Sequence, residues 1–153
     1  MTKDVRSVDV VVVVTKRSDP WLIHFFERDT GDDAGMAVPA RDFLGSVPVQ
    51  VAVEFQAILD AVAKAPPPSF SEGGKWEAKH GDMRGIYEAR VSAGRVNYRL
   101  FCLLVRDSER LGDPSTVCLG GLSKLLRSAA QKRDYELIKR YAGEFGTHQK
   151  VAW

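Results

Sequence analysis

The sequence of 153 residues has only two cysteines and no long apolar run. The longest valine run, at residues 10–14, is far shorter than the roughly 20 apolar residues that cross a bilayer. The segment before it carries no small-residue cleavage site of a secretory signal. The chain also lacks a P-loop, a dinucleotide-binding glycine pattern, H-E-x-x-H and G-x-S-x-G. We therefore expect a cytoplasmic protein without membrane association.

The two cysteines, Cys102 and Cys118, both lie in apolar runs. They show neither C-x-x-C spacing nor a Cys/His pattern typical of metal ligands. This placement predicts reduced, buried thiols rather than a disulfide or a metal site. We expect no metal and no cofactor.

Net charge is small, at +2, but it is unevenly distributed along the chain. Residues 1–75 have 8 Lys/Arg and 11 Asp/Glu, whereas residues 76–153 have 14 and 9. A basic second half fits a surface that binds a polyanion such as a nucleic acid. The alternative is an ordinary solvated basic face.

The first half of the chain predicts two strands followed by a helix. Residues 10–14 and 21–26 are rich in β-branched and aromatic side chains. Between Pro48 and the proline run 66–68, apolar residues recur at helical spacing. They are Val51, Phe55, Ile58, Leu59 and Val62. This helix needs a surface to cover.

The segment MRGIYEARVSAGRVNYRLF, residues 83–101, alternates in a way typical of a β-hairpin, with SAGR as the break. If Val91 lies opposite Val96, the polar residues Glu88, Arg90, Asn97 and Arg99 project from the face away from the helix. The arginines would then lie outside the core, on the other, polar face of the hairpin.

Residues 115–122 predict a further strand, and a terminal helix follows from Ser128 with an apolar stripe. We predict a single domain over residues 1–153, with 1–20 as an extra strand or extension and 146–153 as a tail. The fold class is α+β, with a mostly antiparallel sheet and helices packed on one face.

The motifs GIYEARV and GRVNYRLF, followed by an apolar strand that ends in GGLSK, resemble the RelE/HigB toxin superfamily, in particular its phage-derived HigB-like branch. The match covers most of the chain. It implies a RelE-like fold and the toxin of a type II toxin–antitoxin system. Such toxins cleave messenger RNA, usually on the ribosome and without a metal, and are neutralised by a helix-turn-helix antitoxin.

The resemblance also implies roles for three cations. Arg99 matches the family arginine that contacts the scissile phosphate. Arg90 lies where the family has a basic residue on the neighbouring strand, and we assign it a role in binding phosphate or assisting the leaving group. Lys124 matches the first lysine at the strand end. Guanidinium groups suit phosphate because their N–H donors match its oxygens and they stay charged.

Other candidates have an ordinary alternative. His80 is a candidate for acid–base work, because histidine is the usual proton-transfer residue near neutral pH, or is simply polar surface. Glu88 is a candidate general base, or a salt-bridge partner that orients Arg99. The remaining cations would either contact RNA or solvate the surface. They are Lys79, Arg84, Arg95 and Arg127.

Where the family often has phenylalanine and two lysines, this chain has residues 122–125, LSKL. This difference keeps two alternatives open: a catalytically inactive RNA- or ribosome-binding module and a phage-derived protein-interaction module. The valine run would add an edge strand for a partner or a second copy, so a homodimer also stays open.

Overall fold

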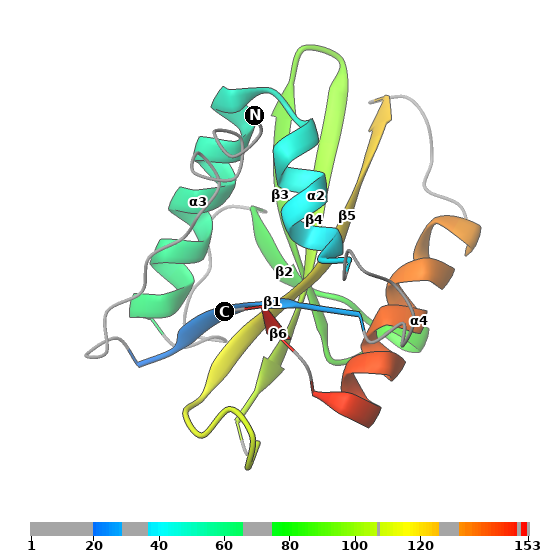
Figure 1. The fold of residues 1–153 in the computed structure, drawn as a ribbon. Coiled ribbons are helices and arrows are strands. Elements are labelled where there is room, and N and C mark those ends of the chain that lie inside the picture. Colours follow the sequence, from blue (N-terminus) through cyan, green and yellow to red (C-terminus); the bar gives the residue numbers. More distant parts are fainter. Residues whose placement is uncertain are drawn as a thin grey trace.

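A computed structural model describes residues 20–28, 37–65, 75–106, 108–125, 132–149 and 151–152. Six strands form one sheet in the order β2-β3-β4-β5-β1-β6 (Figure 1). The strands are β1 (Leu22–Phe26), β2 (Trp76–Ala78), β3 (Ile86–Ala93), β4 (Val96–Val105), β5 (Ser115–Leu125) and β6 (Val151–Ala152). Among the described strand pairs, β1–β5 alone is parallel. The predicted α+β class with a mostly antiparallel sheet is confirmed.

The helices are α2 (Pro39–Ser46), α3 (Val49–Lys64) and α4 (Lys132–His148), with a 3-10 turn η1 (Gly81–Met83). Pro39 opens α2, where a missing N–H has no cost. Pro48 occupies the N-cap position of α3. All five residues of the apolar stripe predicted for this helix are buried. The prediction of this helix is confirmed, and its apolar face covers the sheet.

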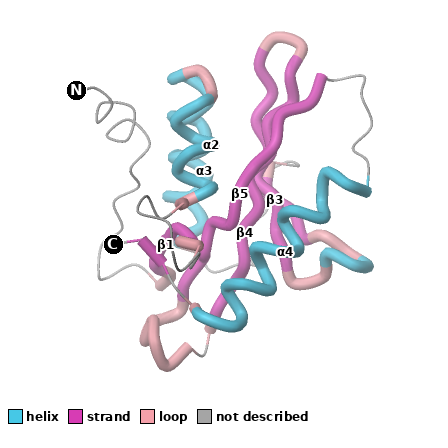
Figure 2. The backbone as a smooth tube through the Cα atoms, turned by 45° about the vertical axis from the view of Figure 1, so that its right-hand side comes forward, coloured by secondary structure: helices cyan, strands magenta, loops and turns pink. Residues whose placement is uncertain are grey.

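Helices cover both faces of the sheet, so the expectation that they pack on one face is wrong. On one face, α2 and α3 pack on Ala89, Val91 and Leu100. On the other, α4 packs on Ile86, Phe101 and Leu119. Figures 1 and 2 show α3 and α4 on opposite sides of the strands. This face of the hairpin carries charged residues near the turn but apolar residues, such as Ile86 and Phe101, near its open end. Those apolar residues are buried by a helix of their own, α4.

The hairpin is confirmed, but its register differs from the prediction. Ala93 pairs with Val96 and Val91 with Tyr98. The turn is therefore only Gly94 and Arg95, and Gly94 takes a positive φ of 62° that favours glycine. The change is two residues, so the predicted faces are kept.

A β-bulge interrupts the pairing of β4 with β5. Phe101 pairs with Gly120 but Cys102 pairs with Cys118, which leaves Leu119 as the extra residue. Because side chains alternate along a strand, the extra residue inverts the faces of all following β5 residues. This places Lys124 opposite Asn97, on the α4 face.

The C-terminal region is more ordered than predicted. Helix α4 extends to His148, and Val151 is buried where β6 pairs with β1. The tail predicted for 146–153 is thus wrong for the described residues in that range, because an apolar contact fixes the segment. The strand at 10–14 and the helix start at Ser128 lie outside the described residues.

The predicted state of the two cysteines is confirmed. Cys102 and Cys118 are free and buried, and their sulfur atoms lie 3.7 Å apart across the β4–β5 pair. Burial raises the pKa of Cys102 well above its usual value, since a thiolate is poorly solvated there.

Candidate functional site

The centre of the site is Glu88, a carboxylate on β3 whose side chain has no solvent exposure. Lys79 Nζ lies 2.8 Å from one of its oxygens. The Nε atoms of Arg90 and Arg99 lie 2.9 and 3.3 Å from the other. A buried carboxylate is tolerated only when it is paired. The sheet therefore holds three cations around one buried anion.

Strand register explains why these groups meet. Arg90 lies directly opposite Arg99, and Glu77 of β2 lies directly opposite Glu88. Like charges facing each other across a ladder repel. Arg90 relieves this by donating to both Glu88 and Glu77. We call the five groups Glu77, Lys79, Glu88, Arg90 and Arg99 the Glu88 network; it has one more cation than anion.

Arg90 is the most exposed cation of the network, at 36 % of its side chain, against 19 % for Lys79 and 17 % for Arg99. Burial by itself lowers the pKa of Arg90, but the hydrogen bond to Glu88 and the charges of Glu88 and Glu77 outweigh it and raise the pKa overall. Arg90 thus stays charged while presenting part of its guanidinium to solvent.

Helix α4 places Tyr135 against the network. Arg99 Nη1 donates to the Tyr135 hydroxyl over 3.0 Å, and Lys79 Nζ lies 5.5 Å from the centre of the Tyr135 ring. The ring also meets Phe101 edge-on at 5.9 Å. With its oxygen turned toward Arg99, the Asn97 amide accepts from Nη2 at 3.2 Å. Arg99 is therefore fixed from several sides.

Lys124 joins this face because of the bulge at Leu119. Its Nζ lies 3.1 Å from Asp134 Oδ2 on α4, and its side chain is 24 % exposed. Its neighbour across the ladder is Asn97, which lies two residues before Arg99 on β4 and so on the same face. The cation that only the family resemblance singled out thus lies on the same face as the Glu88 network.

The other candidates lie apart from the network. His80 is exposed at the start of η1, and no hydrogen bond or ion pair described by the structure joins it to Glu88. Arg84 is exposed after η1, and Arg95 is exposed at the hairpin turn. Arg127 lies outside the described residues. Of the predicted RNA-contacting cations in the described ranges, only Lys79 belongs to the network.

Sequence reasoning missed three participants. Glu77 lies on a strand of three residues, too short to produce a readable alternation. Tyr135 and Asp134 both lie on α4. Because they are far from the hairpin along the chain, no local sequence pattern indicates that they belong to the site. The alternation of β3 and β4, in contrast, did predict that Glu88, Arg90 and Arg99 share a face.

Within the described ranges, no group of three or more His, Cys, Asp and Glu side chains is arranged to hold a metal ion. No helix among those residues is long and apolar enough to cross a membrane. Comparison of the chain with protein-family models, curated proteins and solved structures gives no match.

Proposed function

We propose that the chain is a type II toxin of the RelE/HigB superfamily, in its phage-derived HigB-like branch, that cleaves messenger RNA on the ribosome without a metal ion. One observation carries this proposal. Lys79, Arg90 and Arg99 converge on a buried carboxylate at the hairpin that carries the family resemblance. Such a cluster keeps guanidinium groups oriented before an anionic ligand arrives.

Metal-free RNA cleavage sets three chemical demands. The 2′-hydroxyl must lose a proton, the 5′-oxygen must gain one, and the extra negative charge on phosphorus must be stabilised. The site is best equipped for the last, through the exposed part of Arg90 and through Lys124. Arg99 contributes the N–H groups that Glu88, Tyr135 and Asn97 leave unused.

Glu88 acts in this proposal as a positioning residue rather than a general base. Its oxygens engage three cations and its side chain is sealed from solvent, so an incoming 2′-hydroxyl has no access to it. His80 is exposed next to Lys79 in the chain and remains the candidate for proton transfer.

The alternative is an inactive RNA- or ribosome-binding module, or a phage-derived interaction protein, on the same fold. A specific observation favours it. All three cations of the network and Lys124 have carboxylate partners, so they have a structural use without any ligand. A cytoplasmic location, a helix-turn-helix antitoxin partner and a homodimer belong to the toxin proposal and share its test.

The test compares two lysines that each pair with one aspartate on a different face. Lys124 pairs with Asp134 beside the site, whereas Lys64 pairs with Asp60 on α3 at 2.6 Å. Wild type, Lys124→Ala, Arg90→Ala and Lys64→Ala are induced in a bacterial host. Growth is followed and the 5′ ends of transcripts are mapped. We expect growth arrest and new 5′ ends from wild type and Lys64→Ala, and a loss of both from the other two variants.

The same variants separate the alternatives. Normal growth with intact transcripts, together with RNA binding that weakens steeply with salt, would identify an inactive binding module. For single-stranded RNA, log K falls as log salt rises, and each lost phosphate contact makes this slope less steep by about 0.7. Absence of both cleavage and salt-dependent binding would leave the protein-interaction module.

A further inference from the structure

Within the part of the chain that the structure describes, strand β5 has one long edge without a pairing strand. It pairs with β4 from Ser115 to Leu125, but β1 pairs only with Ser115–Cys118. Among the residues that the structure describes, no strand pairing and no other backbone hydrogen bond occupies the second edge from Leu119 onward. In a strand, every second residue directs its N–H and C=O toward that side. Such an edge is a template for another strand.

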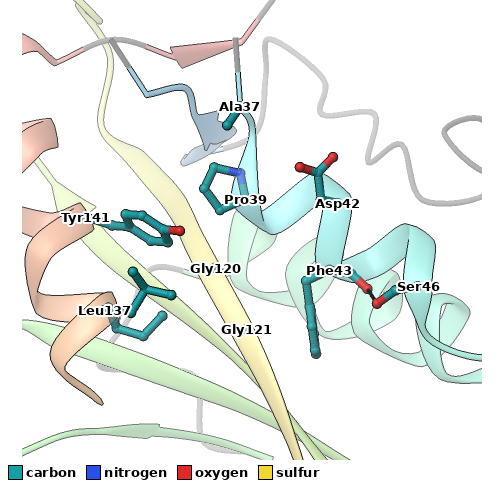
Figure 3. Close-up of a pocket in the computed structure, with 10 residues that line it drawn as sticks. Ala37, Pro39, Asp42, Phe43, Ser46, Gly120, Gly121, Leu137 and Tyr141 are labelled. Atoms are coloured by element: carbon teal, nitrogen blue, oxygen red, sulfur yellow. Dashed lines mark hydrogen bonds between the residues drawn. The ribbon is translucent and has the colours of Figure 1, made fainter. Parts of the chain in front are cut away.

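A groove of about 400 Å³ lies beside this edge. Figure 3 shows Pro39 and Phe43 of α2 on one side, Leu137 and Tyr141 of α4 on the other, and β5 running between them. The floor is formed by Gly120 and Gly121, so it is bare backbone. An extended chain in the groove would meet apolar walls and hydrogen-bonding groups together.

The packing requires glycine at one of these two positions, Gly121. A Cβ on Gly121 would lie 2.3 Å from the Phe43 ring, and a Cβ on Gly120 would lie 3.4 Å from Ile138 and Tyr141. Glycine in a strand often marks a close approach of another backbone. Beside a glycine, a cross-strand neighbour has room for a large side chain.

The rim of the groove is acidic and partly apolar. Asp42 lines the groove from α2, is exposed, and forms no ion pair with any described residue. Leu137 lines the groove from α4 and is 43 % exposed. Leu125, which is 60 % exposed, is not part of the groove lining but ends β5 on the same edge. A ligand that complements this rim carries apolar side chains and a positive charge.

We propose that the edge of β5 from Gly120 to Leu125 docks an extended segment of a partner protein, which adds to the sheet as a strand. Its backbone hydrogen-bonds to β5. One apolar side chain packs against Leu137 and Tyr141, the next packs toward Phe43, and a lysine or arginine pairs with Asp42. Main-chain bonds supply affinity and the alternating pockets supply specificity. This interaction neither requires RNA nor involves the Glu88 network.

The probe is a library of random dodecapeptides displayed on phage and selected on the full chain. We expect the selected sequences to alternate apolar residues and to include a basic residue. Synthetic copies should slow amide hydrogen exchange at Gly120–Leu125, measured by NMR. Leu137→Asp should weaken their binding about tenfold or more, because it places a carboxylate against an apolar side chain.

Two further variants define the site. Val53→Asp changes an apolar residue of similar exposure, 51 %, on α3 and should leave binding unchanged. Asp42→Lys should weaken binding about two- to fivefold, as expected for one exposed ion pair. Unfolding curves are recorded for all three variants, so a folding defect is recognised separately.

Three outcomes would overturn the proposal. One is selection of no peptide that protects Gly120–Leu125, or of peptides insensitive to Leu137→Asp. Another is slow exchange of these amides in the free protein at every concentration, which would show that the chain covers its own edge. The third is slow exchange only at high protein concentration, which would assign the edge to a second copy.

Discussion

The two faces of the sheet use the same strands in different ways. Toward α2 and α3, β3 and β4 direct only apolar or weakly polar side chains into the core, such as Ala89 and Leu100. Toward α4, neighbouring residues include the buried Glu88 and the cations around it. Burying a carboxylate is costly, and an apolar core of equal volume is often as stable or more so. Selection for stability alone therefore accounts for the apolar face under α2 and α3, but not for the buried charges on the α4 face.

The largest effect should come from removing the central charge. Glu88→Gln keeps the size of the side chain but leaves Lys79, Arg90 and Arg99 close together without their shared anion. We expect the free energy of unfolding to fall by about 3 kcal/mol, the lower end for a broken buried pair, because the cations are partly exposed. Urea unfolding followed by circular dichroism measures it.

Its control is Glu144→Gln, which breaks the ion pair of 2.7 Å between Arg28 and Glu144. Both of those side chains are 27 % exposed, so the expected loss is about 1 kcal/mol or less. Equal losses in the two variants would mean that the Glu88 network is no more than another surface ion pair.

Two adjacent glycines allow a second comparison of the faces, because Gly121 faces α2 and Gly120 faces α4; the expected loss of stability is smaller. Gly121→Ala forces a methyl group into Phe43 and should cost about 1–3 kcal/mol of unfolding free energy. Gly120→Ala meets only ordinary contacts on the α4 side and should change stability by less than about 1 kcal/mol. Thermal or urea unfolding of both variants tests this.

Coupling to Phe43 identifies the cause. In a Phe43→Ala background, Gly121→Ala should lose most of its cost, since the clash is removed. If the cost persists there, backbone conformation rather than contact with α2 is responsible.

The smallest effect concerns acid stability at the boundary between β1 and α4. The hydrogen bond from Arg28 lowers the pKa of Glu144 below its usual value of 4.5. As pH falls, the unfolded chain therefore takes up this proton first. The stabilisation is present above about pH 4.5 and is lost as pH falls through the lower folded value.

Wild type and Glu144→Gln should accordingly differ by about 1 kcal/mol or less near neutral pH and converge in acid. Urea unfolding of both proteins across this pH range measures the difference. A gap that widens in acid would contradict the assigned direction of the shift.

Periodicity was sufficient to predict α3, the hairpin and the shared face of Glu88, Arg90 and Arg99, because each of these depends on neighbours along the chain. Contacts between distant segments could not be predicted in that way. Arg99 meets Tyr135 across 36 residues of sequence, and Glu77 meets Arg90 across 13. The hairpin register was wrong because the length of the turn depends on the φ of Gly94.

The packing of α4 on this face was also not predicted, although strand alternation places the apolar residues Ile86 and Phe101 on the same face as Glu88 and Arg99. Polar residues gather toward the turn of the hairpin and apolar residues toward its open end. When the whole face is judged by its overall polarity, this division along its length is lost. The pair Gly120–Gly121 inside a strand was the available signal for the groove.

The bulge at Leu119 has an evolutionary consequence. Deleting that one codon would restore regular pairing and turn over the rest of β5, so Lys124 would leave Asp134 for the opposite side of the sheet. A lineage could thus abolish or recruit a cation on the α4 face through a single in-frame event, with almost no change in composition. In this protein, the presence of Lys124 beside Arg99 depends on the length of a strand as much as on the identity of a residue.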